Sequence, residues 1–268
     1  MLLENKNAVI YGGGGAVGGA VARAFVREGA RVFLAGRTLA TIDAVAEEIS
    51  ASGGVAETAQ VDALDEQAVE KHADAVAEKA GGIDVSFNAI SIRPVQLIPL
   101  VEMSREDFMS PIVTGALTHF LTAGAAARHM VRQGSGVILT LPTSAARLSG
   151  RDRPFHLSGG FGVACAAIEA LTKQLAAELG PRGVRVVCLR PDAIPETWPD
   201  EFRDHVFDAG DGAGRTGAEV RAYMEGGTLL GRPPTLAEVA NVAAFMASDR
   251  ASAMTATVAN ISSGSVVD

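Results

Sequence analysis

The chain has 268 residues, of which 48% are hydrophobic and 20% charged, so a disordered chain is excluded and one domain can bury a full core. A formal net charge of −8 without a basic run argues against nucleic acids and anionic membranes as partners. The two cysteines, Cys165 and Cys188, provide neither a disulfide framework nor a metal-ligand cluster, and they fit a cytoplasmic location.

Apolar runs typical of buried strands alternate along the chain with stretches of helical periodicity. In chain order, the first half is predicted to form strand Asn7–Tyr11, helix Ala16–Glu28, strand Arg31–Ala35, helix Leu39–Ala51, strand Val55–Val61, helix Glu66–Lys79, strand Ile83–Asn88 and helix Glu106–Gln133. The second half is predicted to form strand Gly136–Leu141, helix Gly159–Leu179, strand Val184–Leu189, an irregular polar stretch from Pro191 to Gly231 that could hold two short helices, helix Leu236–Ala247 and strand Ala256–Ile261.

This alternation predicts an α/β fold, a doubly wound parallel sheet of the Rossmann type, with residues 1–268 forming a single domain. Such sheets bind ligands at the carboxyl ends of their strands, so chemistry is expected just after each strand. The charge-free stretch Phe108–Ala127 is long enough for a membrane span, but it has few bulky apolar side chains. A helix packed against protein on all sides is the favoured interpretation.

The segment between the first strand and the first helix is unusually rich in glycine. Glycine permits a tight turn and lets backbone N–H groups approach a pyrophosphate at the positive end of the helix. This context predicts a dinucleotide site that includes Gly12, Gly14, Gly15, Val17 and Gly18. The alternative, a merely flexible turn, would not need so many consecutive glycines.

Motifs along nearly the whole chain resemble the short-chain dehydrogenase/reductase family. The family loop reads Thr-Gly-x-x-x-Gly-x-Gly, and in this chain Tyr11 replaces the threonine and Ala16 the middle glycine. The segment Phe87-Asn88-Ala89-Ile90 is similar to the family's Asn-Asn-Ala-Gly segment. Near the end of the chain, the matching segments are Gly231-Arg232-Pro233, Glu238-Val239-Ala240, Phe245-Met246-Ala247-Ser248-Asp249 and Ala251-Ser252.

The resemblance implies further cofactor contacts. Asp62 and its neighbour Ala63 would contact adenine, and Asn88 and Ala89 belong to the matching segment after the fourth strand. The turn from Pro191 to Ile194 would hold the nicotinamide carboxamide through its backbone. Asp192 replaces the glycine of that turn, which places an acid near the nicotinamide. It could take part in proton transfer if buried, although turn capping is the simpler role.

The end of the second strand bears on the choice of cofactor. An acid there would accept the ribose hydroxyls and select NAD, but the position is Gly36, followed by Arg37 and Thr38. A guanidinium can pair with a 2′-phosphate, and Thr38 adds a hydroxyl donor. We therefore expect NADP(H). The alternative is that Arg37 is only a surface cation.

The family resemblance also implies a catalytic Tyr-x-x-x-Lys pair, a serine and an asparagine, and this chain departs from most of them. Phe161 stands at the tyrosine position, Cys165 at the lysine position and Ile112 at the asparagine position. The serine position falls at Thr143, with Ser144 beside it. Because hydride addition to a carbonyl leaves an alkoxide that needs a proton, another donor is required for turnover.

His156 is the best candidate for that donor, because it lies in the loop after the fifth strand and titrates near neutrality. The alternative is a structural or solvent-facing histidine. Ser158 is a weaker candidate. Four arginines on the same edge of the sheet suggest an anionic substrate, although they could instead pair with surface acids; they are Arg93, Arg147, Arg151 and Arg153.

Three functions remain open at this stage. The first is an NADP(H)-dependent oxidoreductase that acts on a small carbonyl, imine or enoyl compound with a non-standard proton donor. The second is a cofactor-binding protein without redox catalysis, such as a sensor or an inactive partner subunit, and the third is a lyase or isomerase. A substrate lid at about 192–231 and a homotetramer or homodimer, assembled through the charge-free helix and the tail Ala256–Asp268, are also expected.

Overall fold

In the computed structural model, the described residues 1–93, 95, 98–147, 158–198, 206–207 and 214–268 contain one seven-stranded sheet and one two-stranded hairpin. In spatial order, the strands of the large sheet are β3 (Ala56–Gln60), β2 (Arg31–Gly36), β1 (Asn7–Tyr11), β4 (Val85–Asn88), β5 (Gly136–Thr140), β6 (Val184–Pro191) and β9 (Val258–Ile261). Every neighbouring pair in it is parallel, which confirms the predicted doubly wound sheet.

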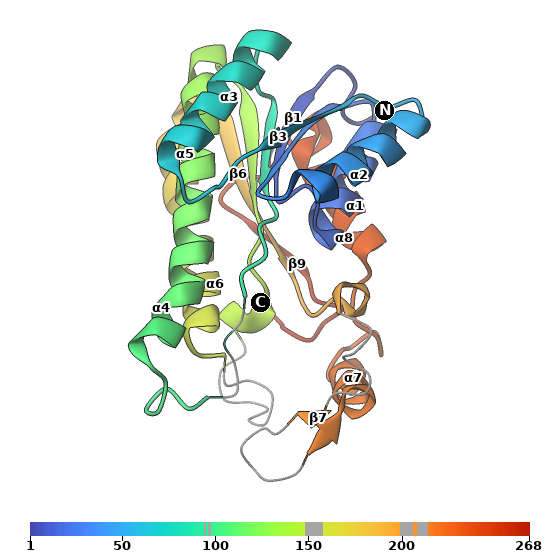
Figure 1. Cartoon of the computed structure of the whole chain (residues 1–268), viewed down its shortest axis with the longest axis vertical. Coiled ribbons are helices and arrows are strands. Elements are labelled where there is room, and N and C mark those ends of the chain that lie inside the picture. Colours follow the sequence, from blue (N-terminus) through green and yellow to red (C-terminus); the bar gives the residue numbers. More distant parts are fainter. Residues whose placement is uncertain (94, 96–97, 148–157, 199–205, 208–213) are drawn as a thin grey trace.

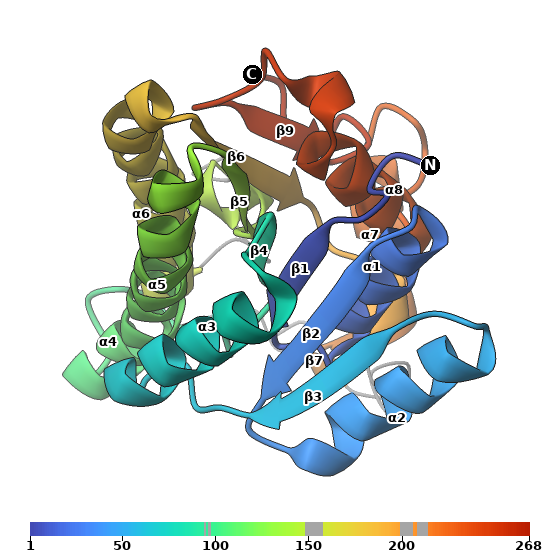
Figure 2. The ribbon, with the colours of Figure 1, turned by 90° about the horizontal axis from the view of Figure 1, so that it is seen from above.

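Helices cover both faces of this sheet, as the view along the layers shows (Figure 2). One face carries α1 (Ala16–Arg27), α2 (Leu39–Ala51) and α8 (Leu236–Ala247), and the other carries α3 (Glu66–Ala80), α5 (Thr118–Gln133) and α6 (Gly159–Leu179). Along β1, Ile10 packs into the core on the first face and Val9 into the core on the second. The strands are apolar on both sides because both sides are covered.

The order of strands reverses at β1, which lies between β2 and β4. The chain first moves outward from β1 to β3 and then returns to β4 to build the other half of the sheet. A switch of this kind leaves a crevice at the carboxyl ends of the two central strands, where doubly wound folds bind their ligands. The fold therefore directs attention to the segments that follow β1 and β4.

The predicted long helix is present but interrupted. Helix α4 (Arg105–Ile112) leads through a π-helical turn, η1 (Val113–Leu117), into α5. Pro111 inside α4 lacks a backbone N–H, and Gly115 lies in the π-turn itself, so both weaken the regular hydrogen-bond ladder.

Within the single chain, this helix is not packed on all sides. One face of α4, η1 and α5 leaves Met109, Val113, Leu117 and Phe120 between 39% and 54% exposed. A membrane span is not the explanation for this surface, since none of the helices among the described residues has the length and apolar character that crossing a bilayer needs. The exposed stripe is available to another protein surface.

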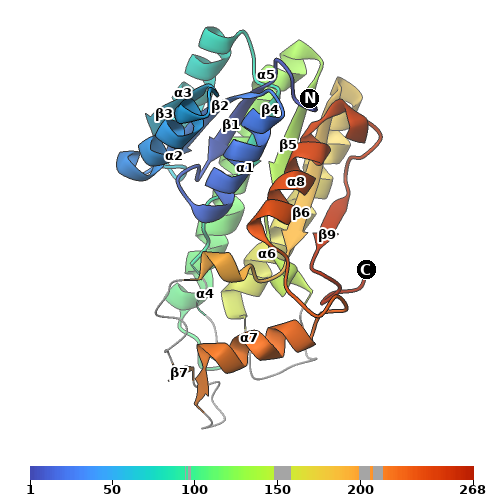
Figure 3. The same cartoon turned by 90° about the vertical axis from the view of Figure 1, so that its right-hand side faces the viewer.

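After β6 the chain forms a small projection beyond the carboxyl ends of the strands (Figures 1 and 3). It consists of η5 (Pro195–Thr197), the hairpin of β7 (Val206–Phe207) with β8 (Arg215–Thr216), and α7 (Gly217–Gly226). The two short helical segments η5 and α7 agree with the expectation of short helices in this polar stretch, and a capping box of Thr216 and Glu219 starts α7.

Candidate functional site

The glycine loop between β1 and α1 adopts a conformation that only glycine can supply. Gly12 has a φ of +78°, and a Cβ there would lie 2.6 Å from the carbonyl oxygen of Ala89. At Gly18, on the first turns of α1, a Cβ would lie 2.2 Å from the carbonyl oxygen of Gly12. The two glycines allow loop, helix and β4 end to approach one another closely, which rules out a merely flexible turn.

The N-terminus of α1 is open toward this loop. Its N-cap residue, Gly15, has no side chain to cap the helix, and the first turn, with the half-buried Val17, contains no acidic residue. Helices α3, α4, α7 and α8 begin with a side-chain cap, whereas α2, α5 and α6 share the lack of one with α1. A Cβ on Gly14 would meet the Thr41 hydroxyl at 2.4 Å. The first N–H groups of α1 therefore remain available to an anion such as a pyrophosphate.

The residues predicted to select the cofactor lie after β2. Arg37 and Thr38 are both exposed, and the Arg37 carbonyl accepts a hydrogen bond of 2.9 Å from the Gln60 side chain. Among the described residues, no carboxylate lies within ion-pair distance of the Arg37 guanidinium. An exposed guanidinium without a described partner is compatible with the expected 2′-phosphate contact and equally with the alternative of a surface cation.

Asp62 and Ala63 follow β3 along the same edge of the sheet. The exposed Asp62 carboxylate accepts a hydrogen bond of 3.0 Å from the backbone N–H of Leu64, and Ala63 is buried. Asp62 therefore stabilises its own turn while one face of the carboxylate stays open to solvent. The arrangement can accommodate the adenine contact that the resemblance implies.

Asn88 and Ala89 fix the end of β4 beside the glycine loop. The buried Asn88 side chain donates to the Thr122 hydroxyl at 3.1 Å and accepts from the Ile90 N–H at 3.0 Å. The Ala89 N–H donates to the Tyr11 carbonyl at 2.8 Å. Asn88 uses both ends of its amide within the protein, so its contribution to a cofactor site is to hold the wall of the crevice in place.

Two hydroxyls follow β5. The Thr143 hydroxyl accepts from the Ala145 N–H at 3.2 Å and lies 3.5 Å from the Cys165 sulfur. Ser144 is buried, starts the short helix η2 (Ser144–Ala146), and donates to the Asp192 carboxylate at 2.5 Å. Thr143 is thus the less enclosed of the two, whereas the Ser144 hydroxyl is committed to an acid on the neighbouring strand end.

The positions on α6 that correspond to the family's tyrosine and lysine carry uncharged side chains. Phe161 lies in the first turn, where its N–H donates to the Ser158 carbonyl at 2.9 Å, and Cys165 lies one turn later and is fully buried. Burial raises the pKa of the Cys165 thiol, so it is not a ready acid or nucleophile. No described atom at these two positions can replace the hydroxyl and cation that the family resemblance implies.

His119 is a buried residue that the sequence analysis missed. Its Nδ1–H donates to the Gly115 carbonyl at 2.8 Å, and its Nε2 accepts from the Leu141 N–H at 3.2 Å. Burial lowers the pKa of His119 to about 4, so the ring is neutral near pH 7. The imidazole ties the π-turn to the end of β5, two residues before Thr143.

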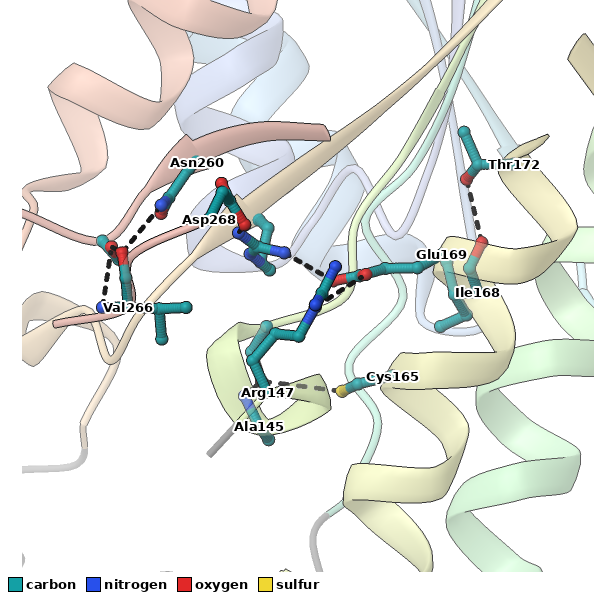
Figure 4. A network of polar contacts seen from close by, with 12 residues as sticks. Ala145, Arg147, Cys165, Ile168, Glu169, Thr172, Asn260, Val266 and Asp268 are labelled. Carbon is teal, nitrogen blue, oxygen red and sulfur yellow. Dashed lines mark hydrogen bonds and ion pairs between the residues drawn. The ribbon is translucent and has the colours of Figure 1, made fainter. Parts of the chain in front are cut away.

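A second feature that went unpredicted is a buried ion network beside η2 (Figure 4). The fully buried Arg190 on β6 donates to Glu169 at 3.1 Å and also bonds Asp268, while the Arg147 guanidinium lies 3.6 Å from Glu169. Burying a guanidinium is costly unless it is paired. The signal in the sequence was the presence of two arginines, Arg185 and Arg190, within the otherwise apolar run of β6.

The turn after β6 completes the described part of this edge. Pro191 and Ile194 are buried, and Asp192 is half-buried between them, with its N–H bonded to the Ile261 carbonyl at 3.4 Å. Asp192 does not adopt a positive φ, so its side chain fits without backbone strain. The predicted donor His156 and the loop residues Arg151 and Arg153 lie outside the described residues.

Comparisons with known proteins agree on the relatives of this chain. A family model described as enoyl-(acyl carrier protein) reductase matches residues 14–265. The chain is 29% identical over 254 residues to 3-oxoacyl-(acyl-carrier-protein) reductase FabG of Chlamydia pneumoniae, and the match covers 95% of this chain and 94% of that protein. It is 31% identical over 257 residues to the L-rhamnose 1-dehydrogenase (NAD(P)(+)) of Azotobacter vinelandii, over 94% of this chain and 93% of the relative.

The same fold occurs in a solved structure titled as a gluconate 5-dehydrogenase from Burkholderia cenocepacia J2315 in complex with NADP and tartrate. The two chains superpose with a TM-score of 0.84 at 22% identity, and the match covers 99% of this chain and 97% of the other. At this level of identity the likeness shows the shared fold.

Proposed function

The chain belongs to the short-chain dehydrogenase/reductase family, whose members are oxidoreductases that use nicotinamide cofactors, and we propose that it is an NADP(H)-dependent oxidoreductase acting on a small carbonyl, imine or enoyl compound. The observation that carries the proposal is the cradle of Gly12 and Gly18 at the uncapped N-terminus of α1, where any Cβ would collide with backbone. Such a cradle matches a pyrophosphate held by backbone N–H groups. It needs no partner from outside the chain.

NADP(H) rather than NAD(H) is supported by Arg37 and Thr38. Both are exposed directly after β2, and Gly36 offers no carboxylate that would repel a 2′-phosphate. Phosphate recognition by a guanidinium is charge-assisted and planar, so an unpaired arginine at this position favours the phosphorylated cofactor.

An anionic substrate is part of the proposal. Arg93 is exposed after the β4 end and has no described ion-pair partner, whereas Arg147, half exposed at the end of η2, lies 3.6 Å from Glu169 and so fits the alternative of pairing within the protein. Both lie on the edge of the sheet that the glycine loop also reaches. Guanidinium groups at the rim of a site pair well with carboxylates and phosphates.

The proton donor differs from that of the family, because Phe161 and Cys165 cannot supply one. We assign it to His156, with Thr143 and Asp192 as the other groups that could transfer a proton. If no donor operates, the protein binds cofactor without turnover. The loss of both the tyrosine and the lysine is what favours this second function.

The proposal also includes a substrate lid, an oligomer and a cytoplasmic location. The segment at about 192–231, which includes η5 and α7 and lies beyond the strand ends, acts as a substrate lid. The exposed stripe on α4 and α5 supports a homotetramer or homodimer. The two cysteines are free and buried, which accords with a cytoplasmic location.

The first test is binding. Titration of the purified protein with NADPH, followed by cofactor fluorescence, should saturate at a stoichiometry of one per chain. Gly18→Ala should abolish the signal, since its methyl group would lie against the Gly12 carbonyl. Gly180→Ala at the exposed end of α6, where φ is −55° and a Cβ meets no other atom, is the control for a general effect of such substitutions. Full binding by Gly18→Ala would contradict the proposed site.

The second test is turnover of a panel of ketones, imines and enoyl compounds with NADPH. Activity should follow a single pKa near neutrality, and His156→Ala should remove that dependence while NADPH still binds. An unchanged pH profile in His156→Ala would transfer the role to Thr143 or Asp192. If NADPH binds and no compound is reduced, the protein is a cofactor-binding member of the family without redox catalysis.

A further inference from the structure

The Asp192 carboxylate is held in one place at the carboxyl edge of the sheet. Its Oδ1 accepts the Ser144 hydroxyl at 2.5 Å, its residue is half-buried, and its N–H reaches the Ile261 carbonyl at 3.4 Å. It thus bridges the ends of β5, β6 and β9. The family resemblance implies that the turn from Pro191 to Ile194 holds the nicotinamide carboxamide, which would place Asp192 next to the ring.

Among the described residues, the ion network on this edge is paired without Asp192. Arg147, Glu169, Arg190 and Asp268 form a network of two guanidinium groups and two carboxylates, so their formal charges cancel. Cys165, which replaces the lysine of the family, is neutral. Among the described residues, no lysine or arginine lies within 4 Å of the Asp192 carboxylate.

We propose that Asp192 makes the nicotinamide end of the site selective for the oxidised cofactor, an inference that rests on the proposed function. The nicotinamide ring of NADP⁺ carries a positive charge, and that of NADPH is neutral. A carboxylate fixed beside the ring in a partly desolvated turn attracts only the charged form. The exchange of a lysine for Cys165 removes the opposing cation.

This selectivity also bears on the missing acid. When bound, NADPH supplies a hydride with both electrons of its C4–H bond, and its ring becomes positively charged. A fixed carboxylate stabilises that developing charge without reorganising, as preorganised groups do in other active sites. Asp192 therefore favours hydride donation to the substrate by stabilising the charge that develops on the cofactor. Other family members instead rely on an acid that protonates the substrate.

The test compares dissociation constants of NADP⁺ and NADPH, and it requires no substrate. Asp192→Asn removes the charge but keeps an oxygen that can accept the Ser144 hydroxyl. Its preference for NADP⁺ over NADPH should be about tenfold lower than that of the unaltered protein, equivalent to ~1.4 kcal/mol. Asp192→Gly removes the charge without the amide and should shift the ratio in the same direction.

Asp249→Asn is the matched control. This carboxylate lies 3.8 Å from Lys6, which precedes β1, and is therefore at the opposite ends of the strands. Asp249→Asn should leave the ratio of the NADP⁺ and NADPH dissociation constants unchanged. If both cofactor forms bind and the ratio is the same in Asp192→Asn as in the unaltered protein, the inference is wrong while the proposed function stands. If neither form binds the unaltered protein, the proposed function itself fails.

Discussion

Single residues decide which cofactor this site accepts and how the protein responds to acid. Arg37 is exposed, and its guanidinium can make the proposed ion pair only with a phosphate that a ligand brings. His119 is the reverse case, a neutral imidazole whose two nitrogens are both satisfied inside the protein. The first is expected to matter for binding and the second for stability.

Arg37→Ala should weaken NADPH binding and leave NADH binding nearly unchanged. The lost contact is a charge-assisted hydrogen bond to the 2′-phosphate, worth about 1.5–3 kcal/mol, or roughly a 10- to 150-fold loss of affinity. Fluorescence titration with both cofactors measures the ratio. Equal affinities in the unaltered protein, or a ratio that Arg37→Ala leaves unchanged, would show that Arg37 is only a surface cation.

The free energy of unfolding should fall as the pH decreases from about 6.5 to about 4. Burial lowers the pKa of both His119 and His72 to about 4, so the unfolded chain binds protons in this window and the folded chain does not. Each histidine contributes a slope of up to about 1.4 kcal/mol per pH unit. Their stabilising effect is present above the unfolded pKa and is lost as the pH falls.

His119→Gln should remove about half of the histidine contribution to that slope, measured by urea unfolding at several pH values. Comparing slopes rather than absolute stabilities separates titration from the loss of the bonds to Gly115 and Leu141. His119→Gln with His72→Gln should remove most of it. A slope that does not change in either variant would mean that these two rings titrate normally in the folded protein.

At the scale of elements, the interrupted helix of α4, η1 and α5 contacts the sheet on one side and is exposed on the other. Its inner side carries Thr118, His119 and Thr122, which bond to the ends of β4 and β5. Its outer side leaves Phe120 more than half exposed. The helix thus positions the candidate site on one side and offers an apolar surface to another chain on the opposite side.

Phe120→Asp should convert an oligomer to smaller species in light scattering at micromolar concentration. A charge in the middle of the exposed stripe would be desolvated by a second copy, which costs several kcal/mol unless it is paired. Val55→Asp, an exposed apolar residue before the edge strand β3, is the matched control and should leave the assembly intact. If the unaltered chain is a monomer, the proposed oligomer is excluded.

At the scale of the whole molecule, the candidate site exists only because four segments distant in sequence meet at one edge. The glycine loop follows β1, Thr143 follows β5, Cys165 lies on α6 and Asp192 follows β6. Parallel strands bring their carboxyl ends together, so the loops between them share one crevice. The chemistry of the site can therefore be altered at one position without rebuilding the fold.

Restoring the family residues together, as Phe161→Tyr with Cys165→Lys, should increase the reduction of ordinary ketones. A positioned general acid contributes about 10²–10⁴-fold in rate, and this chain lacks the one that its relatives would use. Rates with NADPH and a ketone panel measure the gain. Phe161→Tyr alone is the control, since the tyrosine needs the lysine cation to lower its pKa. No gain in the double variant, with NADPH binding intact, would mean that the site geometry has diverged as well.

The sequence by itself determined the order of the sheet strands and main helices along the chain, the glycine loop after β1, and the absence of a tyrosine at Phe161 and of a lysine at Cys165. Helix α6 agrees with its predicted bounds, because periodicity and caps act over a few residues. The tertiary structure alone decided which side chains meet. Ser144 and Asp192 are 48 positions apart, and Arg190 and Asp268 are 78 positions apart. Such contacts depend on how strand ends and helices pack, and no local pattern along the chain encodes them.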